Sequence, residues 1–153
     1  MKPRMNYYQA APDTVKALVA LEEQIQASGL EKSLIELVKT RASQINGCAY
    51  CADMHARDGA RHGETARRLA VLPVWRETEL FTAQERAALA LTEAISHLSE
   101  TRDVPDEVYA EAAEAFSERQ LAVVIWAASL IQTFNGINVA GRKPLPEQDW
   151  SGS

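Results

Sequence analysis

The fold is decided by residues 34–55, LIELVKTRASQINGCAYCADMH. Apolar residues in the first half of this stretch recur at spacings of three and four, as they do on one face of a helix. Asn46 and Gly47 then interrupt the pattern, because both residue types tolerate left-handed backbone angles. We therefore predict two helices, at about residues 31–44 and 48–63. If these helices fold back on each other, two cysteines lie at the turn of a helical hairpin.

The rest of the chain has the same helical character. β-Branched residues are scattered, and no alternation of apolar and polar residues lasts five positions, so strands are not expected. Further helices are predicted at about residues 13–28, 64–69, 82–98, 105–116 and 117–134, with an irregular stretch from Pro73 to Phe81. The last of these helices is apolar on nearly all sides, which is typical of a helix at the centre of a domain or shared between subunits.

These signals predict a single all-α domain, a helical bundle of about six to eight helices over residues 1–143. A length of 153 residues suits one domain. Asn135 and Gly136 are expected to end the last helix near Phe134. The C-terminal tail, residues 144–153, carries two prolines and ends in Ser-Gly-Ser, and we expect it to be extended.

Composition and charge narrow the classes of function. Hydrophobic residues make up 46% of the chain and charged residues 24%, which is ordinary for a globular protein. The net charge of -5 and the lack of a basic cluster disfavour nucleic-acid binding. No apolar targeting segment precedes Pro12, and the longest apolar run, residues 121–131, is too short to span a bilayer. We therefore expect a cytoplasmic protein with no membrane or nucleic-acid partner.

The chemistry of the chain is expected at Cys48, Cys51 and His55. Two cysteines this close do not form the widely spaced framework of a secreted scaffold, and in a cytosolic chain they point to redox chemistry or metal binding. Positions three and four apart share a helix face, so the two sulfurs can meet and His55 can lie beside them. Unpaired N–H groups at the helix start favour a thiolate, which is the reactive form. A nearby imidazole can accept or donate the proton.

Glu36 joins this group through the geometry of the hairpin. It lies twelve positions before Cys48. In an antiparallel pair of helices, Glu36 would lie about 16 Å back from the turn and His55 about 12 Å beyond it, at the rise of an α-helix. The carboxylate and the imidazole could therefore face each other, and the carboxylate would orient the ring and raise its basicity.

Several alternatives remain open at this stage. Cysteines on a helix can be small buried hydrophobes, and a zinc site could use Cys48, Cys51 and His55, with His62 as a fourth ligand. Tyr50 either packs over the dithiol or contacts the substrate. Helix-terminus electrostatics favour Cys48 as the attacking residue, whereas the histidine spacing favours Cys51.

The arrangement resembles a known family. The order of the candidate residues resembles that of the alkylhydroperoxidase AhpD-like group, which is part of the carboxymuconolactone decarboxylase-like superfamily. In this order Glu36 is followed after eleven residues by the motif CAYC at Cys48–Cys51, and His55 follows after three more residues. The specific likeness covers residues 34–63, and residues 134–140 are similar to the end of the last core helix of the family.

This resemblance implies an all-helical fold and peroxide reduction by a dithiol/disulfide cycle without another cofactor. Cys51 would attack the peroxide and become a sulfenic acid, and Cys48 would resolve it as a disulfide. Glu36 and His55 would relay protons to Cys51, and a dithiol or a thiol protein would reduce the pair. The resemblance also implies a homotrimer or homohexamer. Tyr50 is a departure, because characterised alkylhydroperoxidases carry histidine there, and tyrosine exchanges its proton less readily near neutral pH.

Other activities remain as alternatives to the peroxidase. The same pair could serve a general disulfide reductase or a redox sensor. A decarboxylase of the superfamily is a further alternative, but the lactone enzymes do not need a CxxC motif.

Overall fold

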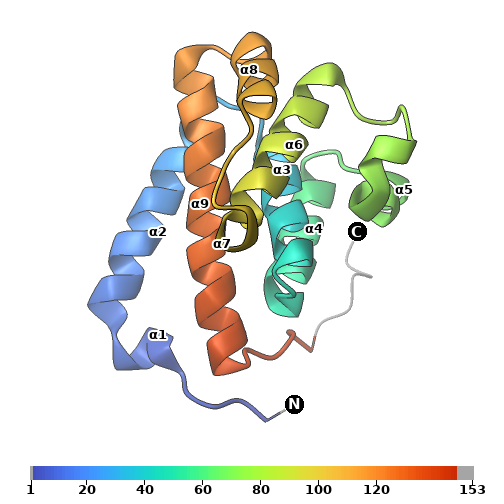
Figure 1. Cartoon of the computed structure of the whole chain (residues 1–153). Coiled ribbons are helices and arrows are strands. Elements are labelled where there is room, and N and C mark those ends of the chain that lie inside the picture. Colours follow the sequence, from blue (N-terminus) through green and yellow to red (C-terminus); the bar gives the residue numbers. More distant parts are fainter. Residues whose placement is uncertain (1, 148–153) are drawn as a thin grey trace.

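The computed structural model describes residues 2–147, and within that range all regular secondary structure is helical (Figure 1). The helices are α1 (Tyr7–Ala10), α2 (Pro12–Gln26), α3 (Lys32–Ile45), α4 (Ala49–Arg61), α5 (Ala66–Val71), the 3-10 helix η1 (Leu72–Glu77), α6 (Ala83–Ser96), α7 (Leu98–Thr101), α8 (Asp106–Ala115) and α9 (Glu118–Gly141). The prediction of an all-α chain is confirmed.

The number of helices differs from the prediction of six to eight. Nine α-helices are present in the described range, and two of them, α1 and α7, have four residues each. Helices this short show no hydrophobic period, so no pattern in the sequence predicts them. The stretch expected to be irregular also contains η1, which begins next to Pro73 and buries Leu72 and Trp75.

The long helix α9 is the centre of the molecule and packs against α2, α3, α4, α6 and α8 (Figure 1). It is also long and apolar enough to cross a membrane by length and composition, with a mean hydropathy of 1.4 over its most apolar window. A central core helix has the same composition, because its sides are covered by other helices. The main hydrophobic core lies between α9 and its neighbours and includes Ile35, Leu91 and Val124.

The predicted end of α9 near Phe134 is wrong. The helix continues for about two more turns to Gly141, and Arg142 follows in a left-handed conformation. Asn135 does not break it, because its side chain bonds to partners on other segments instead of competing for its own backbone. The non-helical part of the tail that the structure describes is short, and residues 148–153 of the predicted tail lie outside the described residues.

The predicted break between α3 and α4 is present at Asn46 and Gly47. Gly47 has a φ of 68°, a backbone conformation that favours glycine, and Asn46 is the C-cap of α3. The two helices lie against each other along much of their length. This hairpin brings the middle of α3 next to the middle of α4, which is what positions the candidate site.

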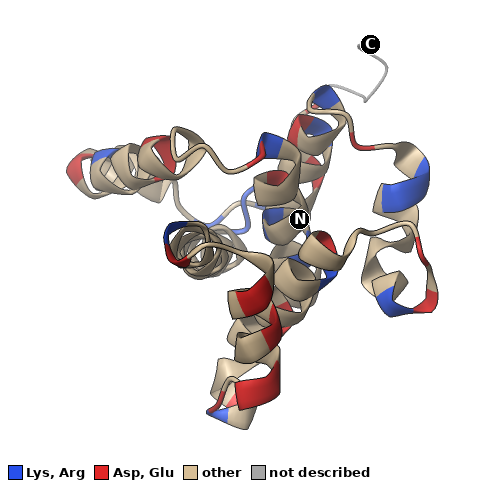
Figure 2. Ribbon diagram, turned by 90° about the horizontal axis from the view of Figure 1, so that it is seen from above, with Lys and Arg blue, Asp and Glu red and all other residues tan. Residues whose placement is uncertain are grey.

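Charged residues are distributed over the whole molecule. In the view of Figure 2, Lys and Arg are interspersed with Asp and Glu on several helices. Some form networks that fix the surface elements, such as Arg68 with Glu64 and Glu85. Glu93 similarly binds Arg41 and Arg76.

Candidate active site

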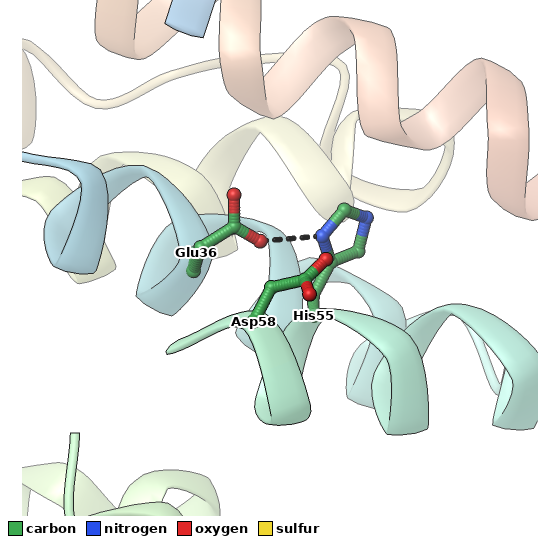
Figure 3. A group of neighbouring side chains, drawn as sticks. All are labelled: Glu36, His55 and Asp58. Atoms are coloured by element: carbon green, nitrogen blue, oxygen red, sulfur yellow. Dashed lines mark hydrogen bonds and ion pairs between the residues drawn. The ribbon is translucent and has the colours of Figure 1, made fainter. Parts of the chain in front are cut away.

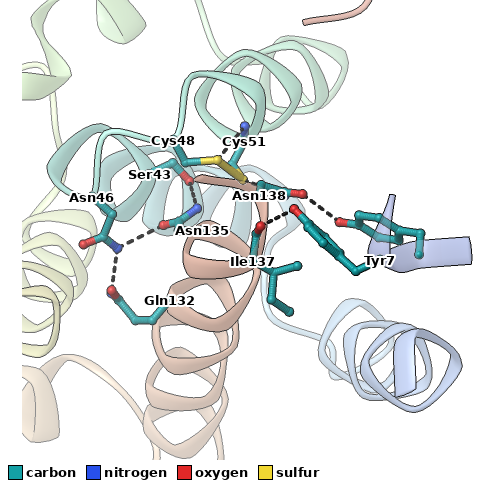
Figure 4. Close-up of a disulfide and its surroundings, with 10 residues drawn as sticks. Tyr7, Ser43, Asn46, Cys48, Cys51, Gln132, Asn135, Ile137 and Asn138 are labelled. Atoms are coloured by element: carbon teal, nitrogen blue, oxygen red, sulfur yellow. Dashed lines mark hydrogen bonds between the residues drawn. A yellow bond between two sulfur atoms is a disulfide. The ribbon is translucent and has the colours of Figure 1, made fainter. Parts of the chain in front are cut away.

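The two cysteines form a disulfide at the turn between α3 and α4 (Figure 4). Their Cα atoms are 5.4 Å apart, a normal distance for a disulfide. Cys48 is the N-cap of α4, and its Sγ accepts a hydrogen bond from the backbone N–H of Cys51 at 3.3 Å. Both residues are buried, with exposed fractions of 2% and 1%. The prediction that the sulfurs meet is therefore confirmed.

Glu36 and His55 meet across the hairpin, as the geometric argument predicted. His55 Nδ1 lies 2.7 Å from Glu36 Oε2, and both side chains are buried (Figure 3). Gln26 of α2 donates a hydrogen bond of 2.7 Å to the other carboxylate oxygen, so both oxygens have partners. The imidazole is thus held by one buried carboxylate on a neighbouring helix.

The charge state of Glu36 follows from its neighbours. Burial alone would raise the pKa of this carboxyl. The hydrogen bond from His55, the charges of His55 and Lys39 and the hydrogen bond from Gln26 outweigh that effect, and they hold the pKa below its ordinary value of 4.5. Glu36 is therefore a carboxylate at neutral pH, and it accepts the hydrogen bond from Nδ1–H. That leaves His55 Nε2 to exchange a proton elsewhere.

Cys51 and the Glu36–His55 pair face one cavity. This space, the Cys51 cavity, has a volume of about 310 Å³. Cys51, Glu36, His55 and Asp58 line it, and so does Lys39, which forms an ion pair with Glu22. Apolar side chains of α9 complete the wall. A small molecule in this cavity would be in reach of both the sulfur and the imidazole.

Cys48 faces a different cavity on the other side of the disulfide. This space, the Cys48 cavity, has a volume of about 570 Å³. Its lining includes Arg4 from the N-terminal segment and Arg142 and Lys143 from the end of α9. The two cavities share Tyr50, among other residues, as a dividing wall.

Asn138 is a site residue that the sequence reasoning missed. It is buried on α9, and its Nδ2 lies 3.2 Å from Cys51 Sγ (Figure 4). Its Oδ1 accepts a hydrogen bond of 3.0 Å from the hydroxyl of Tyr8. The available signal was a pair of asparagines three residues apart on a largely apolar helix. Asn135, the other member of that pair, bonds to Ser43 and fixes α9 against the turn.

Residues 12–94 match the carboxymuconolactone decarboxylase family. The chain belongs to this family. The matched range contains Glu36, Cys48, Cys51 and His55, whereas Asn138 lies beyond it. The resemblance inferred from the motif is therefore confirmed at the level of the family.

Two similar proteins align with nearly the whole of this chain. The Bacillus subtilis protein YdfG, which is uncharacterised, is 36% identical over 140 residues, covering 92% of this chain and 95% of its own. A crystal structure from Agrobacterium tumefaciens, Atu0492, is 39% identical with a TM-score of 0.91, and covers 96% of this chain and 100% of that chain. That protein is described as of unknown function and as a candidate antioxidant defence protein AhpD.

The debrominase Bmp8 has the same fold at lower sequence identity. It is 21% identical with a TM-score of 0.79, over 91% of this chain and 74% of its own. At this level of identity the likeness shows the fold alone.

Tyr50 packs over the disulfide, which was one of the two roles left open for it, whereas its contact with a substrate stays a prediction. The ring of Tyr50 packs against the buried cluster that contains both cysteines, and the residue lines both cavities. The ammonium of Lys143 lies 3.9 Å from the centre of the Tyr50 ring and 4.1 Å from that of Tyr8. Such cation–π contacts fix the ring in place.

The alternative of a zinc site on the cysteines does not match the arrangement. His62 is exposed at the C-cap of α4, about 16 Å from Cys51 along the helix. Over residues 2–147, the group of side chains close enough to share a metal ion is Glu36, His55 and Asp58, whose ligand atoms lie within 4.8 Å of one another (Figure 3). These three are the residues that could hold a cation, and neither cysteine is among them.

Proposed function

We propose that this protein is a thiol-dependent peroxidase that reduces small hydroperoxides through a Cys48–Cys51 dithiol/disulfide cycle. The observation that carries the proposal is that Cys51 opens into the same cavity as the buried Glu36–His55 pair, while Cys48 lies behind it within disulfide distance. A nucleophile, a proton donor and a resolving thiol are thus arranged around one reacting oxygen. The match to the family and the likeness to a candidate AhpD support the same chemistry.

The first step oxidises Cys51. The Cys51 thiolate attacks the terminal oxygen of the hydroperoxide, the O–O bond breaks, and the sulfur becomes a sulfenic acid. The leaving alkoxide takes a proton from His55 and departs as an alcohol, or as water when the substrate is hydrogen peroxide. Glu36 holds the imidazolium in position through its hydrogen bond to Nδ1.

The second step uses Cys48. The Cys48 thiol attacks the sulfenic sulfur of Cys51, the S–O bond breaks, and the leaving hydroxide takes the proton of that thiol and departs as water, so that the disulfide forms. Two thiols have then given two electrons to one peroxide. An external thiol must return the pair to the reduced state.

Access and hydrogen bonding favour Cys51 as the attacking residue. Cys51 shares its cavity with His55, and the Nδ2–H of Asn138 points at its sulfur and would stabilise a thiolate there. The N-cap position of Cys48 also favours a thiolate, but its cavity contains no histidine among the described residues. Cys48 is therefore suited to resolve the sulfenic acid.

A turnover assay tests the proposal. Purified protein should consume hydrogen peroxide and an organic hydroperoxide with dihydrolipoamide as the dithiol donor, and Cys51→Ser should abolish this activity. In Cys48→Ser, a sulfenic-acid probe should label Cys51 after peroxide is added. The assignment of the two cysteines would be reversed if the probe labelled Cys48 in the Cys51→Ser variant and did not label Cys51 in the Cys48→Ser variant.

The proton relay has its own test within the same assay. Glu36→Gln should lower the rate of Cys51 oxidation by about 100-fold, in the range expected for general acid catalysis, and should change its dependence on pH. An unchanged rate and pH profile would remove Glu36 from the mechanism. A protein that is oxidised once by peroxide but does not turn over with any thiol would be a sensor and not a peroxidase.

A further inference from the structure

The disulfide separates two cavities that differ in size and lining. Cys51 lines the smaller one with Glu36 and His55, and Cys48 lines the larger one. Tyr50, Asn138 and Lys143 contribute to both and form the wall between them. Each sulfur therefore faces a different space, although the two atoms are bonded to each other (Figure 4).

The two cavities also differ in charge. The Cys48 cavity is lined by Arg4, Arg142 and Lys143, and no Asp or Glu of the described chain lines it. The Cys51 cavity, in contrast, is lined by three carboxylates, one imidazole and two ammonium groups, from Glu22, Glu36, Asp58, His55, Lys39 and Lys143. An anion is therefore favoured next to Cys48 and not next to Cys51.

The cations of the Cys48 cavity have no carboxylate partner within residues 2–147. Arg4 donates to the backbone oxygen of Ala140, and Lys143 lies over two tyrosine rings. Five other arginines of the described chain do form ion pairs with carboxylates, for example Arg57 with Asp53. A concentration of unpaired positive charge around a cavity of about 570 Å³ is the setting in which a small anionic ligand binds.

We propose that the Cys48 cavity is the binding site of the electron donor, and that this donor is a small thiol carrying a carboxylate. The proposal rests on the thiol cycle above and adds to it the site and the chemical class of the reductant. The carboxylate binds among Arg4, Arg142 and Lys143, and the apolar residues Val139 and Leu145 contact the carbon chain.

The reduction then proceeds from the Cys48 side. The donor thiolate attacks Cys48 Sγ, the Cys48–Cys51 bond breaks, and Cys51 leaves as a thiolate that Asn138 stabilises. A second donor thiolate attacks the donor sulfur of the mixed disulfide, which releases the oxidised donor and the Cys48 thiolate. Two donor thiols lose two electrons, and the protein dithiol gains them. Because the peroxide enters from the Cys51 cavity, donor and oxidant do not compete for one space.

The test measures reduction of the oxidised protein without any peroxide. Three thiols of similar size are compared: 3-mercaptopropionate, which is anionic, 2-mercaptoethanol, which is neutral, and cysteamine, which is cationic. Rate constants are expressed per thiolate and divided by those of the same thiols with a small uncharged disulfide, so that differences in ionised fraction and in intrinsic nucleophilicity cancel. At low ionic strength the anionic thiol should be at least about tenfold faster than the neutral one, and cysteamine should be the slowest.

Matched variants connect this preference to the cavity. In the double variant Arg4→Gln/Arg142→Gln the ratio of the rate constants of the anionic and the neutral thiol should fall to within about threefold, because the additional charge of the carboxylate is no longer recognised. Arg119→Gln is the control, because this exposed arginine lies about 35 Å away at the other end of α9. Equal rates for anionic and neutral thiols in the unmodified protein, or a preference that survives the double variant, would overturn the proposal.

The position of attack is tested by quenching the reaction with N-ethylmaleimide. Fragmentation of the peptide that contains both cysteines should place the donor on Cys48 and the alkyl group on Cys51. The reverse placement would contradict the proposal. Since no peroxide is present, a protein that prefers anionic thiols but does not reduce peroxides would keep the donor site and lose the proposed function. A protein that reduces peroxides equally well with neutral and anionic thiols would keep the proposed function and lose the donor site.

Discussion

The Glu36–His55 pair shows how a buried carboxylate can be kept ionised. Its oxygens accept hydrogen bonds from His55 and Gln26, and these bonds with the nearby positive charges outweigh the effect of burial on the pKa. A carboxyl group whose pKa is lowered in the folded state stabilises that state while it is ionised. The residue that orients the imidazole therefore also contributes to the stability of the fold.

This linkage predicts a dependence of stability on pH. Because the pKa of Glu36 is lower when folded, its contribution is fully present above the ordinary value of 4.5 and is lost as the pH falls through the folded value. Glu36→Gln should lower the free energy of unfolding at pH 7 by about 1–3 kcal/mol. The difference between the two proteins in urea denaturation should shrink below pH 4.5. A difference that stays constant down to pH 3 would contradict this prediction.

The hydrogen bond from Asn138 is expected to stabilise the Cys51 thiolate, and this effect can be measured. Asn138→Ala removes the N–H group that points at Cys51 Sγ, so the thiolate loses a hydrogen bond. In a Cys48→Ser background, the rate of Cys51 alkylation by iodoacetamide at pH 7 should fall by about tenfold, because a hydrogen bond to a charged group contributes about 1.5 kcal/mol. Asn135→Ala is the matched control, since Asn135 bonds to Ser43 and not to sulfur. Equal losses of reactivity in both variants would indicate a general loosening of α9.

At the scale of elements, the C-terminal part of α9 connects the site to the N-terminal segment. The backbone N–H of Arg4 donates to the oxygen of Gly141 at 3.0 Å, and the hydroxyl of Tyr7 donates to the backbone oxygen of Ile137. Tyr8 reaches Asn138 from the same segment. Residues near the chain start thus help to fix the asparagine that contacts Cys51.

Two glycines of α9 should respond in opposite ways to alanine. A Cβ at Gly141 would overlap the Tyr7 ring, whereas a Cβ at Gly136 would meet nothing within 4 Å. Gly141→Ala should therefore destabilise the protein by about 1–3 kcal/mol. Gly136→Ala should stabilise it by about 0.5–1 kcal/mol, as expected inside a helix. Thermal unfolding checks both, and a shift in the same direction for the two variants would be incompatible with the close approach of α1.

At the scale of the whole molecule, α9 is covered on most but not all sides. Trp126 is 56% exposed and Val139 is 47% exposed, although the helix is otherwise central. Exposed aromatic residues are enriched where proteins associate. We therefore propose the surface around Trp126 as the contact surface of the homotrimer or homohexamer, which is itself still a prediction.

We predict that Trp126→Arg dissociates this oligomer. A charge in the centre of an apolar interface is costly to bury, so the variant should elute as a smaller species with unchanged helical content. Size-exclusion chromatography with light scattering and circular dichroism measure the two properties. A monomeric unmodified protein at micromolar concentration would show that the expectation of an oligomer is wrong.

The sequence by itself determined the features that depend on residues close together in the chain. The all-α character, the break at Asn46 and Gly47 and the meeting of Cys48 with Cys51 follow from periodicity and from spacings of three or four residues. Even the contact of Glu36 with His55 was predictable, because one turn and a fixed helical rise set the distance. The roles of these residues in catalysis stay predictions, which the experiments above test.

Only the tertiary structure decided the features that join distant segments. Asn138 reaches Cys51 across 87 positions, and no local pattern specifies which face of α9 meets the turn. The continuation of α9 past Asn135 depends on partners in other helices, which override the tendency of that residue to end a helix. The difference in charge between the mixed lining of the Cys51 cavity and the basic lining of the Cys48 cavity has the same cause. Packing brings Arg4 and Arg142 together from opposite ends of the chain, and sequence spacing carries no information about that contact.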